Sequence, residues 1–480
     1  MNRKMIFYTL GKLLVALSAL LLLPIVVSLL YKEHCILSFL IAAAISLVAG
    51  LLLTFFCKPT SHVIYAREGF AIVSLVWLSM SVIGALPFVI SGEIPSFVDA
   101  FFETVSGFTT TGASILRNVE AMSHGLLFWR SFTHWIGGMG VLVFVMALLP
   151  NISDRSIHIL RAEVPGPIVG KLVPRIKDTA KILYIIYIVL TVVEVIFLLA
   201  GGMPLFDSLL HAFGTAGTGG FGVKADSIAG YSPYLQWVIA VFMLLFGVNF
   251  NIYYMLLIRK FRYVFRSGEL LCYLGVVLLS VAAICINVYP MYETFAETLR
   301  QSFFQVSSII TTTGYATTDF NLWPAFSKGI LFVLMFVGAC AGSTGGGLKI
   351  SRVMLIFKII ARELRRLIHP RSVAKVKLDG KGVNESTLDG VTAYFGIYMA
   401  CIFGVFLVVS LDPLGFETNL SATVACFNNI GPGFVGVGPC ANYAAYSALS
   451  KIVLSIAMLL GRLEIYPLLI VLIPSFWKKD

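Results

Sequence analysis

Four short segments rich in threonine and glycine recur along the chain, and each lies between two long apolar runs. They occupy residues 109–112 (TTTG), 217–220 (GTGG), 311–314 (TTTG) and 428–431 (NNIG), with final glycines 94 to 117 residues apart. Six residues before each final glycine stands a small residue: Ser106, Gly214, Ser308 and Ala425. This recurrence predicts four copies of helix, re-entrant loop and helix. Four loops of polar backbone around one axis are what an ion selectivity filter needs.

The composition indicates a membrane protein. Of 480 residues, 58% are hydrophobic and 12% are charged, whereas soluble domains carry about 25% charged residues. A membrane helix needs about 20 apolar residues. We therefore predict an all-α polytopic membrane protein with ten spans, near 9–30, 35–57, 69–91, 127–149, 181–201, 235–258, 269–289, 328–356, 389–411 and 450–474.

The spans divide the chain into five predicted units. The first two form an N-terminal transmembrane hairpin, and the other eight form four pairs around a central pore. The predicted units are the hairpin at 1–66 and pore repeats at 67–170, 171–266, 267–380 and 381–480, the third of which contains an intramembrane gate loop.

Within each pair lies a segment that is neither a full span nor a polar loop. Each opens near a proline, a residue that suits the first turn of a helix: Pro95, Pro204, Pro290 and Pro413. Acids follow, which favour the positive end of a helix dipole: Asp99, Asp207, Glu293, Glu297 and Glu417. About ten mostly apolar residues come next, too few to cross a bilayer. We expect short helices that enter the membrane partway.

Basic residues orient the chain, because cytoplasmic loops carry an excess of lysine and arginine. Arg3 and Lys4 precede the first span, Lys478 follows the last, and the loops 150–181 and 358–381 are strongly basic. Both termini are therefore expected in the cytoplasm, and the short helices enter from outside. The net charge of +11 lies in short loops between spans, so nucleic acid is not an expected partner.

The recurring segments suit the binding of a dehydrated cation. Backbone carbonyls can replace the water shell of the ion if the chain turns them inward, and glycine permits the backbone angles that this needs. A single Thr-Gly run would be interpreted as a tight turn or a helix-packing surface. Four copies with matched flanks favour the filter.

These features resemble the TrkH branch of the Trk/Ktr/HKT potassium transporters over nearly the whole chain, including the extra hairpin. The resemblance also rests on Gly137-Gly138-Met139-Gly140 and Gly345-Gly346-Gly347-Leu348-Lys349. It implies potassium and rubidium uptake, with the ion held at the filter. The filter residues would be Thr110, Thr111, Gly112, Thr218, Gly219, Gly220, Thr312, Thr313, Gly314, Asn429, Ile430 and Gly431. In plant relatives, serine at the first filter glycine accompanies sodium preference, and this chain has Gly112 there.

The resemblance also implies partners and a location. Family members form homodimers in the bacterial-type inner membrane, among its lipids, and bind a cytoplasmic ring of TrkA-type nucleotide-binding subunits. The basic segments 150–181 and 355–385 could dock such a ring. We find no nucleotide-binding motif in this chain, and no cofactor is expected.

A glycine-rich stretch interrupts the predicted span 328–356. Glycine costs about 1 kcal/mol against alanine inside a helix, so Gly342, Gly345, Gly346 and Gly347 should unwind it. The alternative is a small-residue face for helix packing. The resemblance implies an intramembrane gate below the filter, formed by Gly342, Ser343, Thr344, Gly345, Gly346, Gly347, Lys349 and Arg462.

Two arginines lie in apolar spans, where a charge is costly and usually functional. Arg462 is expected either to pair with another helix or to place a positive charge in the pore, as a matching arginine in the family implies. Its nearest acid, Glu464, should point elsewhere on a helix. Arg130 and His134 are expected to pair with Glu103 or with another acid of a short helix, a structural role that we favour over a proton relay.

Three functions compete at this point. Four parallel loop repeats favour a channel-like uptake protein over a proton- or sodium-coupled symporter, whose sites lie at broken helices. A membrane enzyme would need a convergent set of acids, bases or metal ligands, and we find none. The eight cysteines are interpreted as small core residues, because none lies in a CxxC pair.

Overall fold

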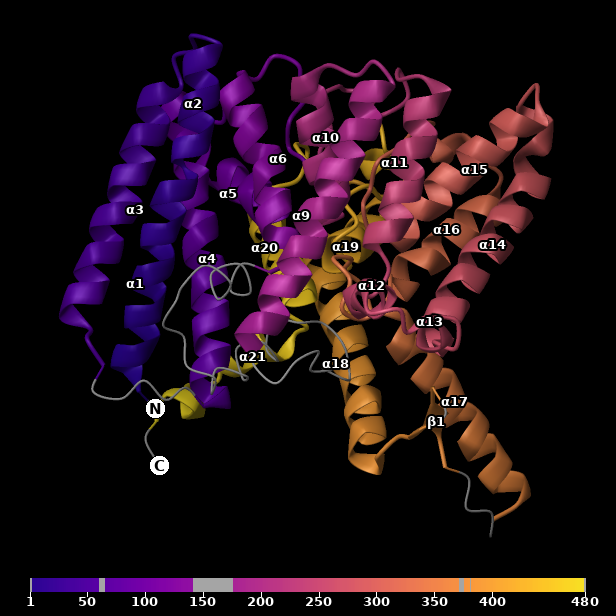
Figure 1. Ribbon diagram of the computed structural model, residues 1–480. Coiled ribbons are helices and arrows are strands. Elements are labelled where there is room, and N and C mark those ends of the chain that lie inside the picture. The colour runs from indigo at the N-terminus through magenta and orange to yellow at the C-terminus, as the bar shows by residue number, and fades with distance from the viewer. Residues whose placement is uncertain (1, 60–64, 141–175, 371–374, 380, 479–480) are drawn as a thin grey trace.

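The computed structural model describes residues 2–59, 65–140, 176–370, 375–379 and 381–478 (Figure 1). The described part is helical apart from short loops and one antiparallel hairpin. In that hairpin β1 (Lys377–Leu378) pairs with β2 (Lys381–Gly382), with Lys377 opposite Gly382. Both chain termini lie at the same end of the molecule, as Figure 1 shows. This arrangement agrees with termini on one side of a membrane.

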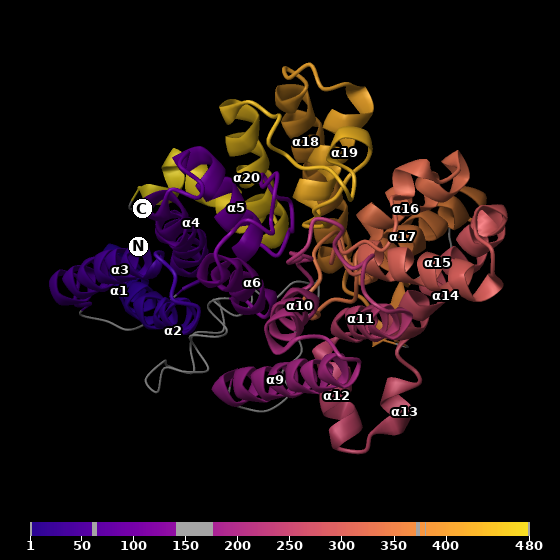
Figure 2. The same cartoon turned by 90° about the horizontal axis from the view of Figure 1, so that it is seen from above.

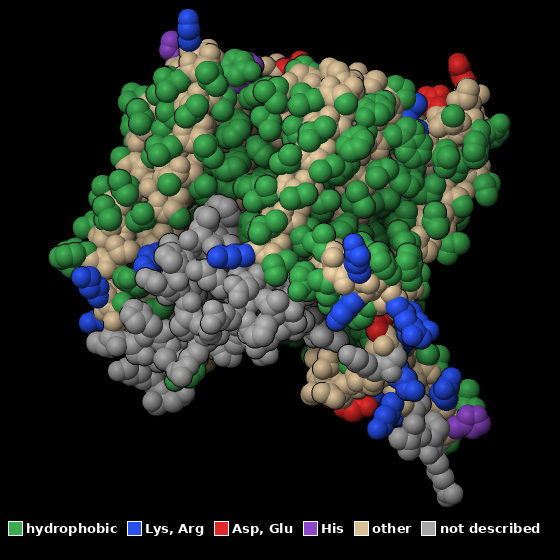
Figure 3. Space-filling model, in the orientation of Figure 1, with side chains coloured by type: hydrophobic (Ala, Val, Ile, Leu, Met, Phe, Trp, Pro, Cys, Tyr) green, Lys and Arg blue, Asp and Glu red, His purple; other side chains and the backbone are tan. Residues whose placement is uncertain are grey.

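Within the described ranges, six stretches are long and apolar enough to cross a membrane. They are Arg3–Leu30, which contains α1 (Arg3–Leu20) and α2 (Leu22–Leu30), then α3 (Ile36–Phe56), α4 (Ala66–Ser91), the Lys181–Ala200 part of α9 (Ile176–Ala200), Gly268–Met291 with α14 (Gly268–Val288), and α18 (Glu385–Val409). Large apolar side chains on their outer faces are exposed, for example Leu279 and Ile286 on α14. Figure 3 shows these side chains as a broad apolar surface.

The N-terminal helices pack as a hairpin against the rest. α1 and α3 approach closely at Gly11 and Gly50. A β-carbon on either glycine would lie only 2.8 Å from the carbonyl oxygen of the other. Small residues allow such approach between membrane helices.

Four of the described helices lie where the sequence predicts short helices that enter the membrane only partway. They are α5 (Phe97–Phe108), α10 (Leu205–Gly217), α15 (Phe295–Ile310) and α19 (Phe416–Phe427). The longest has 16 residues, about 24 Å at 1.5 Å per residue, against a hydrocarbon core of about 30 Å. Each has an acid in its first turn: Asp99, Asp207, Glu297 and Glu417. The predicted short helices are confirmed, each with an acid in its first turn, whereas Glu293 lies outside α15, before its first residue.

Seen from above, the four short helices lie on different sides of the middle of the molecule (Figure 2). Their C-terminal residues are buried although many are polar. Thr109, Thr110 and Thr111 are fully buried, as are Thr311, Thr312 and Thr313. Buried polar side chains therefore gather where these helices end.

Three predicted spans are interrupted. α11 (Pro233–Phe246) and α12 (Phe250–Leu257) meet at a 90° bend, so the predicted span over 235–258 is not one continuous helix. α20 (Ala448–Arg462) and α21 (Tyr466–Leu472) are separated by residues 463–465, so the predicted span over 450–474 is not continuous either. α16 (Ala325–Val337) and α17 (Ile350–Ile368) flank a non-helical stretch, as the glycines predicted.

Each of the two unexpected breaks has an identifiable cause. At the first, the Cys340 N–H donates to the Gly247 carbonyl at 3.1 Å and the Phe250 N–H to the Gly342 carbonyl at 3.1 Å, so another segment takes over backbone groups that the helix releases. At the second, Glu464 and Ile465 adopt φ of 54° and 65°, in the left-handed region that ends a helix.

The other elements lie around these breaks. α6 (His124–Gly138) ends where the structure ceases to describe the predicted 127–149 span, whose residues 141–149 lie outside the described ranges, as does most of the basic loop 150–181. α13 (Phe261–Val264) and the short 3-10 turns Tyr289–Met291, Phe320–Leu322, Val435–Val437 and Pro474–Trp477 complete the described elements.

Glu33 connects the N-terminal helical hairpin to the first residues of α6. Glu33, between α2 and α3, accepts hydrogen bonds from the N–H groups of His124 at 2.7 Å and Gly125 at 2.9 Å. Burial raises the pKa of Glu33, but these backbone hydrogen bonds and the neighbouring imidazole outweigh it and leave the pKa lowered. The ionised carboxylate therefore stabilises the junction, and that stability is lost as pH falls through the lowered pKa.

We expect Glu33→Ala to reduce the free energy of unfolding by about 1 kcal/mol, as for loss of a helix cap. Thermal unfolding of purified protein in detergent measures this at neutral pH. The difference from wild type should shrink below about pH 4, near the pKa of a free glutamate. The control is Asp389→Ala at an exposed position of α18. Equal loss in both variants, or no loss in Glu33→Ala, would contradict the assignment.

Candidate functional site

Each of the four short helices ends in the same hydrogen-bonded turn. In α5 the Thr110 N–H donates to the Gly107 carbonyl at 3.1 Å, and the Thr111 N–H to the Ser106 carbonyl at 2.9 Å. This is the Schellman arrangement, in which one left-handed residue closes the helix. The left-handed residues are Thr110, Thr218, Thr312 and Asn429, with φ of 53°, 55°, 59° and 56°.

The recurring small residues are the acceptors in this turn. The carbonyls of Ser106, Gly214, Ser308 and Ala425 accept from the N–H groups of Thr111, Gly219, Thr313 and Ile430 at 2.8 to 2.9 Å. The sequence spacing of six residues to the final glycine therefore corresponds to one turn geometry, repeated four times.

The four final glycines form a closed ring with the carbonyls that precede them. A β-carbon on Gly112 would overlap the Gly219 carbonyl oxygen, and one on Gly220 would overlap that of Thr313. A β-carbon on Gly314 would overlap the Ile430 carbonyl oxygen, and one on Gly431 would lie 2.5 Å from that of Thr111. Each loop thus contacts the next, and the fourth returns to the first. We call these four glycines and four carbonyls the glycine ring.

Backbone conformation at the ring also requires glycine. The φ angles of Gly112, Gly220, Gly314 and Gly431 are 78°, 77°, 87° and 94°, values that L-residues with a side chain rarely adopt. All four line a cavity of about 140 Å³ on one side of the ring. The first and fourth loops are further linked by the Asn429 side-chain amide, which donates to Thr111 Oγ1 at 3.0 Å.

The stretch between α16 and α17 packs directly against the ends of two short helices. Residues 338–349 contain left-handed backbone at Gly338, Gly342, Gly347 and Lys349. The Gly346 N–H donates to Thr312 Oγ1 at 2.6 Å. A β-carbon would lie 3.0 Å from the Thr311 carbonyl oxygen if placed on Gly345, and 2.5 Å from that of Asn428 if placed on Gly346. The helix-packing interpretation of these glycines is wrong, because the stretch is a loop.

Arg462 joins this loop to α6. Its guanidinium donates to the carbonyls of Thr344 at 2.7 Å and Gly138 at 2.7 Å, and also to that of Gly137. Lys349 Nζ donates to the Gly345 carbonyl within the loop. Glu464 pairs with Arg352 at 2.6 Å, which confirms that it points away from Arg462. The structure therefore brings together the residues that the sequence grouped as a predicted gate.

Sequence reasoning missed two anchors of the loop. Glu269, buried at the start of α14, accepts from the Ala341 N–H at 2.6 Å. Asn249, in the α11–α12 bend, lies against Gly342, where a β-carbon would be 3.1 Å from Asn249 Oδ1. Both residues could have been found by their polarity, because each interrupts or borders an apolar run. Polar residues in membrane spans are usually functional.

Arg130 and His134 have the structural role expected of them. Arg130 Nε lies 2.6 Å from Glu103 Oε1, with both side chains buried. His134 Nδ1 lies 2.7 Å from the Gly107 carbonyl oxygen, and the Phe221 N–H lies 3.3 Å from its Nε2. The predicted pairing with Glu103 is confirmed, and both residues connect the first loop to the second.

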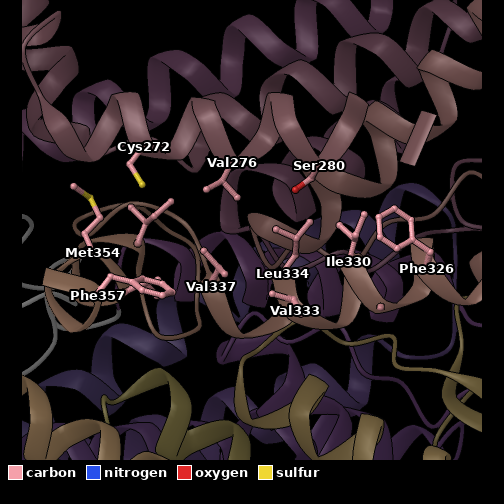
Figure 4. Close-up of a pocket in the computed structure, with 13 residues that line it drawn as sticks. Cys272, Val276, Ser280, Phe326, Ile330, Val333, Leu334, Val337, Met354 and Phe357 are labelled. Atoms are coloured by element: carbon pink, nitrogen blue, oxygen red, sulfur yellow. The ribbon is translucent and has the colours of Figure 1, made fainter. Parts of the chain in front are cut away.

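An apolar groove of about 640 Å³ lies beside the loop, between α14 and the two helices that flank the loop. Val337 and Ile350, the residues next to the loop on each side, line it together with Val276 and Leu334. Figure 4 shows the side chain of Val276 on one side of the space, with Leu334 and Val337 on the other. The groove is therefore bounded by α14 and by the two helices on either side of the loop.

Comparison with known proteins agrees with this geometry. Residues 36–479 match the model of the TrkH family, described as cation transport proteins. The chain is 37% identical to the Trk system potassium uptake protein TrkH of Salmonella typhimurium over 98% of both chains, and 35% identical to that of Halomonas elongata over 100% of both. The crystal structure of the potassium transporter TrkH from Vibrio parahaemolyticus aligns with a TM-score of 0.89 and 33% identity over 100% of both chains. The protein belongs to the TrkH family of cation transport proteins.

Proposed function

We propose that the protein takes up potassium, and also rubidium, across the cytoplasmic membrane, and that the glycine ring is its selectivity filter. The observation that carries this proposal is the closure of the ring, in which each final glycine faces a carbonyl of the next loop. Relatives named as potassium uptake proteins support potassium as the ion. The filter residues are Thr110, Thr111, Gly112, Thr218, Gly219, Gly220, Thr312, Thr313, Gly314, Asn429, Ile430 and Gly431.

The helix ends favour a cation at the ring. Four helices direct their C-terminal ends toward it, and the C-terminal end of a helix carries about half a negative charge. Carbonyl oxygens in the ring can replace the water shell of a potassium ion. The loops differ in sequence, with Asn429 and Ile430 in the fourth, so the ion need not be held with fourfold symmetry.

The loop beneath the ring is the gate of this proposal. Gly342, Ser343, Thr344, Gly345, Gly346, Gly347 and Lys349, with Arg462, form it. Hydrogen bonds from Arg462 connect the loop to α6, which supports a closed path. A positive charge at this depth also lowers the occupancy of cations below the filter. The apolar groove offers space into which the flanking helices can shift.

A cytoplasmic partner completes the proposal. The relatives are components of a Trk system, which supports control by TrkA-type nucleotide-binding subunits acting on a homodimer in the inner membrane. Arg365 and Arg366 are exposed near the end of α17, which leads directly from the gate loop. A subunit bound there would act on the gate through one helix.

Coupled symport is the second candidate. The loop is itself the break between α16 and α17, and the α11–α12 bend adjoins it. Secondary transporters place their ion sites at such discontinuous helices. On this alternative, a proton or sodium gradient would drive potassium through the same ring.

We expect Gly220→Ala to reduce potassium flux by roughly tenfold or more. The left-handed conformation alone costs alanine about 1–2 kcal/mol, and the new methyl group would overlap the Thr313 carbonyl, while about 1.4 kcal/mol changes a rate tenfold. Flux into liposomes holding purified protein is the measurement. Gly404→Ala, on α18 with open space around it, should behave as wild type. Full flux in Gly220→Ala would contradict the filter.

Deletion of residues 345–347 is expected to raise potassium flux without changing the preference among cations. The deletion removes the part of the loop that packs under the third and fourth loops and leaves the ring intact. Fluxes of potassium, rubidium and sodium measured on the same preparation provide the internal control. Flux equal to that of wild type would exclude these residues as the gate.

Arg462→Ala should increase single-channel conductance, because it removes a positive charge and the contacts with Thr344 and Gly138. Arg462→Lys, which keeps the charge, is the matched variant and should conduct nearly as wild type does. Recordings in planar bilayers make the comparison. A folded Arg462→Ala protein with unchanged conductance would show that the arginine has a structural role alone.

A further inference from the structure

Tyr315 connects the third loop to the second. It directly follows Gly314, and its side chain is 1% exposed. Its hydroxyl lies 3.2 Å from the carbonyl oxygen of Phe221, the residue that follows Gly220, and 3.2 Å from that of His211 on α10. The Tyr315 hydroxyl therefore contacts one backbone carbonyl before the second loop and one after it.

α10 contains a space shaped for this hydroxyl. A β-carbon on Gly214 would overlap Tyr315 Oη. Gly214 has ordinary helical backbone, so conformation alone does not require glycine there. The small residue at this position of the second repeat is thus explained by the phenol that it admits.

Both ends of Tyr315 are fixed. Ser308 Oγ donates to the Tyr315 carbonyl at 2.6 Å, and the Ile228 N–H donates to the carbonyl of Ala316 at 3.0 Å. His211, beside the hydroxyl, lies between two tyrosines, with Nδ1 3.4 Å from Tyr315 Oη and Nε2 3.2 Å from Tyr231 Oη. Tyr231 in turn donates to Asp207 at 3.0 Å. The phenol is held by a buried polar network rather than by apolar packing alone.

The other three loops have no equivalent at this position. The residues that follow the ring glycines are Ala113, Phe221 and Pro432, none of which carries a hydroxyl. Tyr315 is therefore a contact between the second and third loops that the repeat pattern does not predict.

We propose that Tyr315 is a specificity-determining positioning residue, whose hydroxyl holds the second and third loops at the separation that suits potassium. The inference rests on the proposed filter. A ring that cannot contract around a smaller ion leaves sodium without the oxygens that would replace its water. Loss of the hydroxyl lets these two loops approach or separate, and sodium then competes better.

The test compares potassium-to-sodium permeability ratios, from reversal potentials of the full-length protein in planar bilayers. We expect Tyr315→Phe to lower the ratio about fivefold, the factor that corresponds to one net hydrogen bond, while potassium current persists. Gly214→Ala should lower it similarly, because its methyl group displaces the phenol. Tyr234→Phe, which removes an exposed hydroxyl, and Gly396→Ala, in open space on α18, should match wild type.

The two test variants separate folding from selectivity. Gly214→Ala removes no hydrogen-bonding group, and alanine has the better helix propensity. If Tyr315→Phe cannot be purified as folded protein, the permeability ratio of Gly214→Ala tests the proposal instead. A selective wild type with unchanged ratios in the recovered variants overturns the role of Tyr315 and leaves the filter standing. A wild type that conducts both ions equally overturns the filter, and this inference with it.

Discussion

A helix that ends inside a membrane leaves carbonyl groups without partners, and the rest of this structure follows from how those groups are used. Water cannot satisfy them at that depth. Each short helix therefore closes with one left-handed residue, which satisfies the carbonyls of the last turn. The chain beyond that residue is free to direct its carbonyls toward the middle of the molecule, where a cation can replace the missing donors.

The same constraint explains why glycine recurs outside the ring. Gly137 on α6 and Gly461 on α20 lie so close to α5 and α19 that a β-carbon would overlap the carbonyls of Phe108 and Phe427. α6 and α20 thus pack closely against the C-terminal ends of α5 and α19, while charged side chains lie below these ends. Arg462 donates hydrogen bonds to carbonyls in two segments that are more than 200 residues apart. The positions of these two segments therefore depend on each other.

Much of this could be predicted from sequence because it repeats. The short helices, their first-turn acids and the break at Gly342–Gly347 each have a local signal in residue type and spacing. The break at 463–465 was not predicted, although its backbone hydrogen bonds are local and depend on left-handed backbone at Glu464 and Ile465. The bend at 247–249 could not be predicted, because it lies in an apolar run and its released backbone groups find partners distant in sequence. Glu269 and Tyr315 were missed for the same reason, since their roles depend on contacts between different repeats.

The most direct test of the account is cation flux into liposomes that hold the purified protein alone, under an imposed voltage and with no proton or sodium gradient. The account predicts voltage-driven flux of potassium and rubidium well above that of sodium and lithium. Flux that appears only when a proton or sodium gradient is present would contradict a selective pore, and the ring would then be the binding site of a coupled transporter.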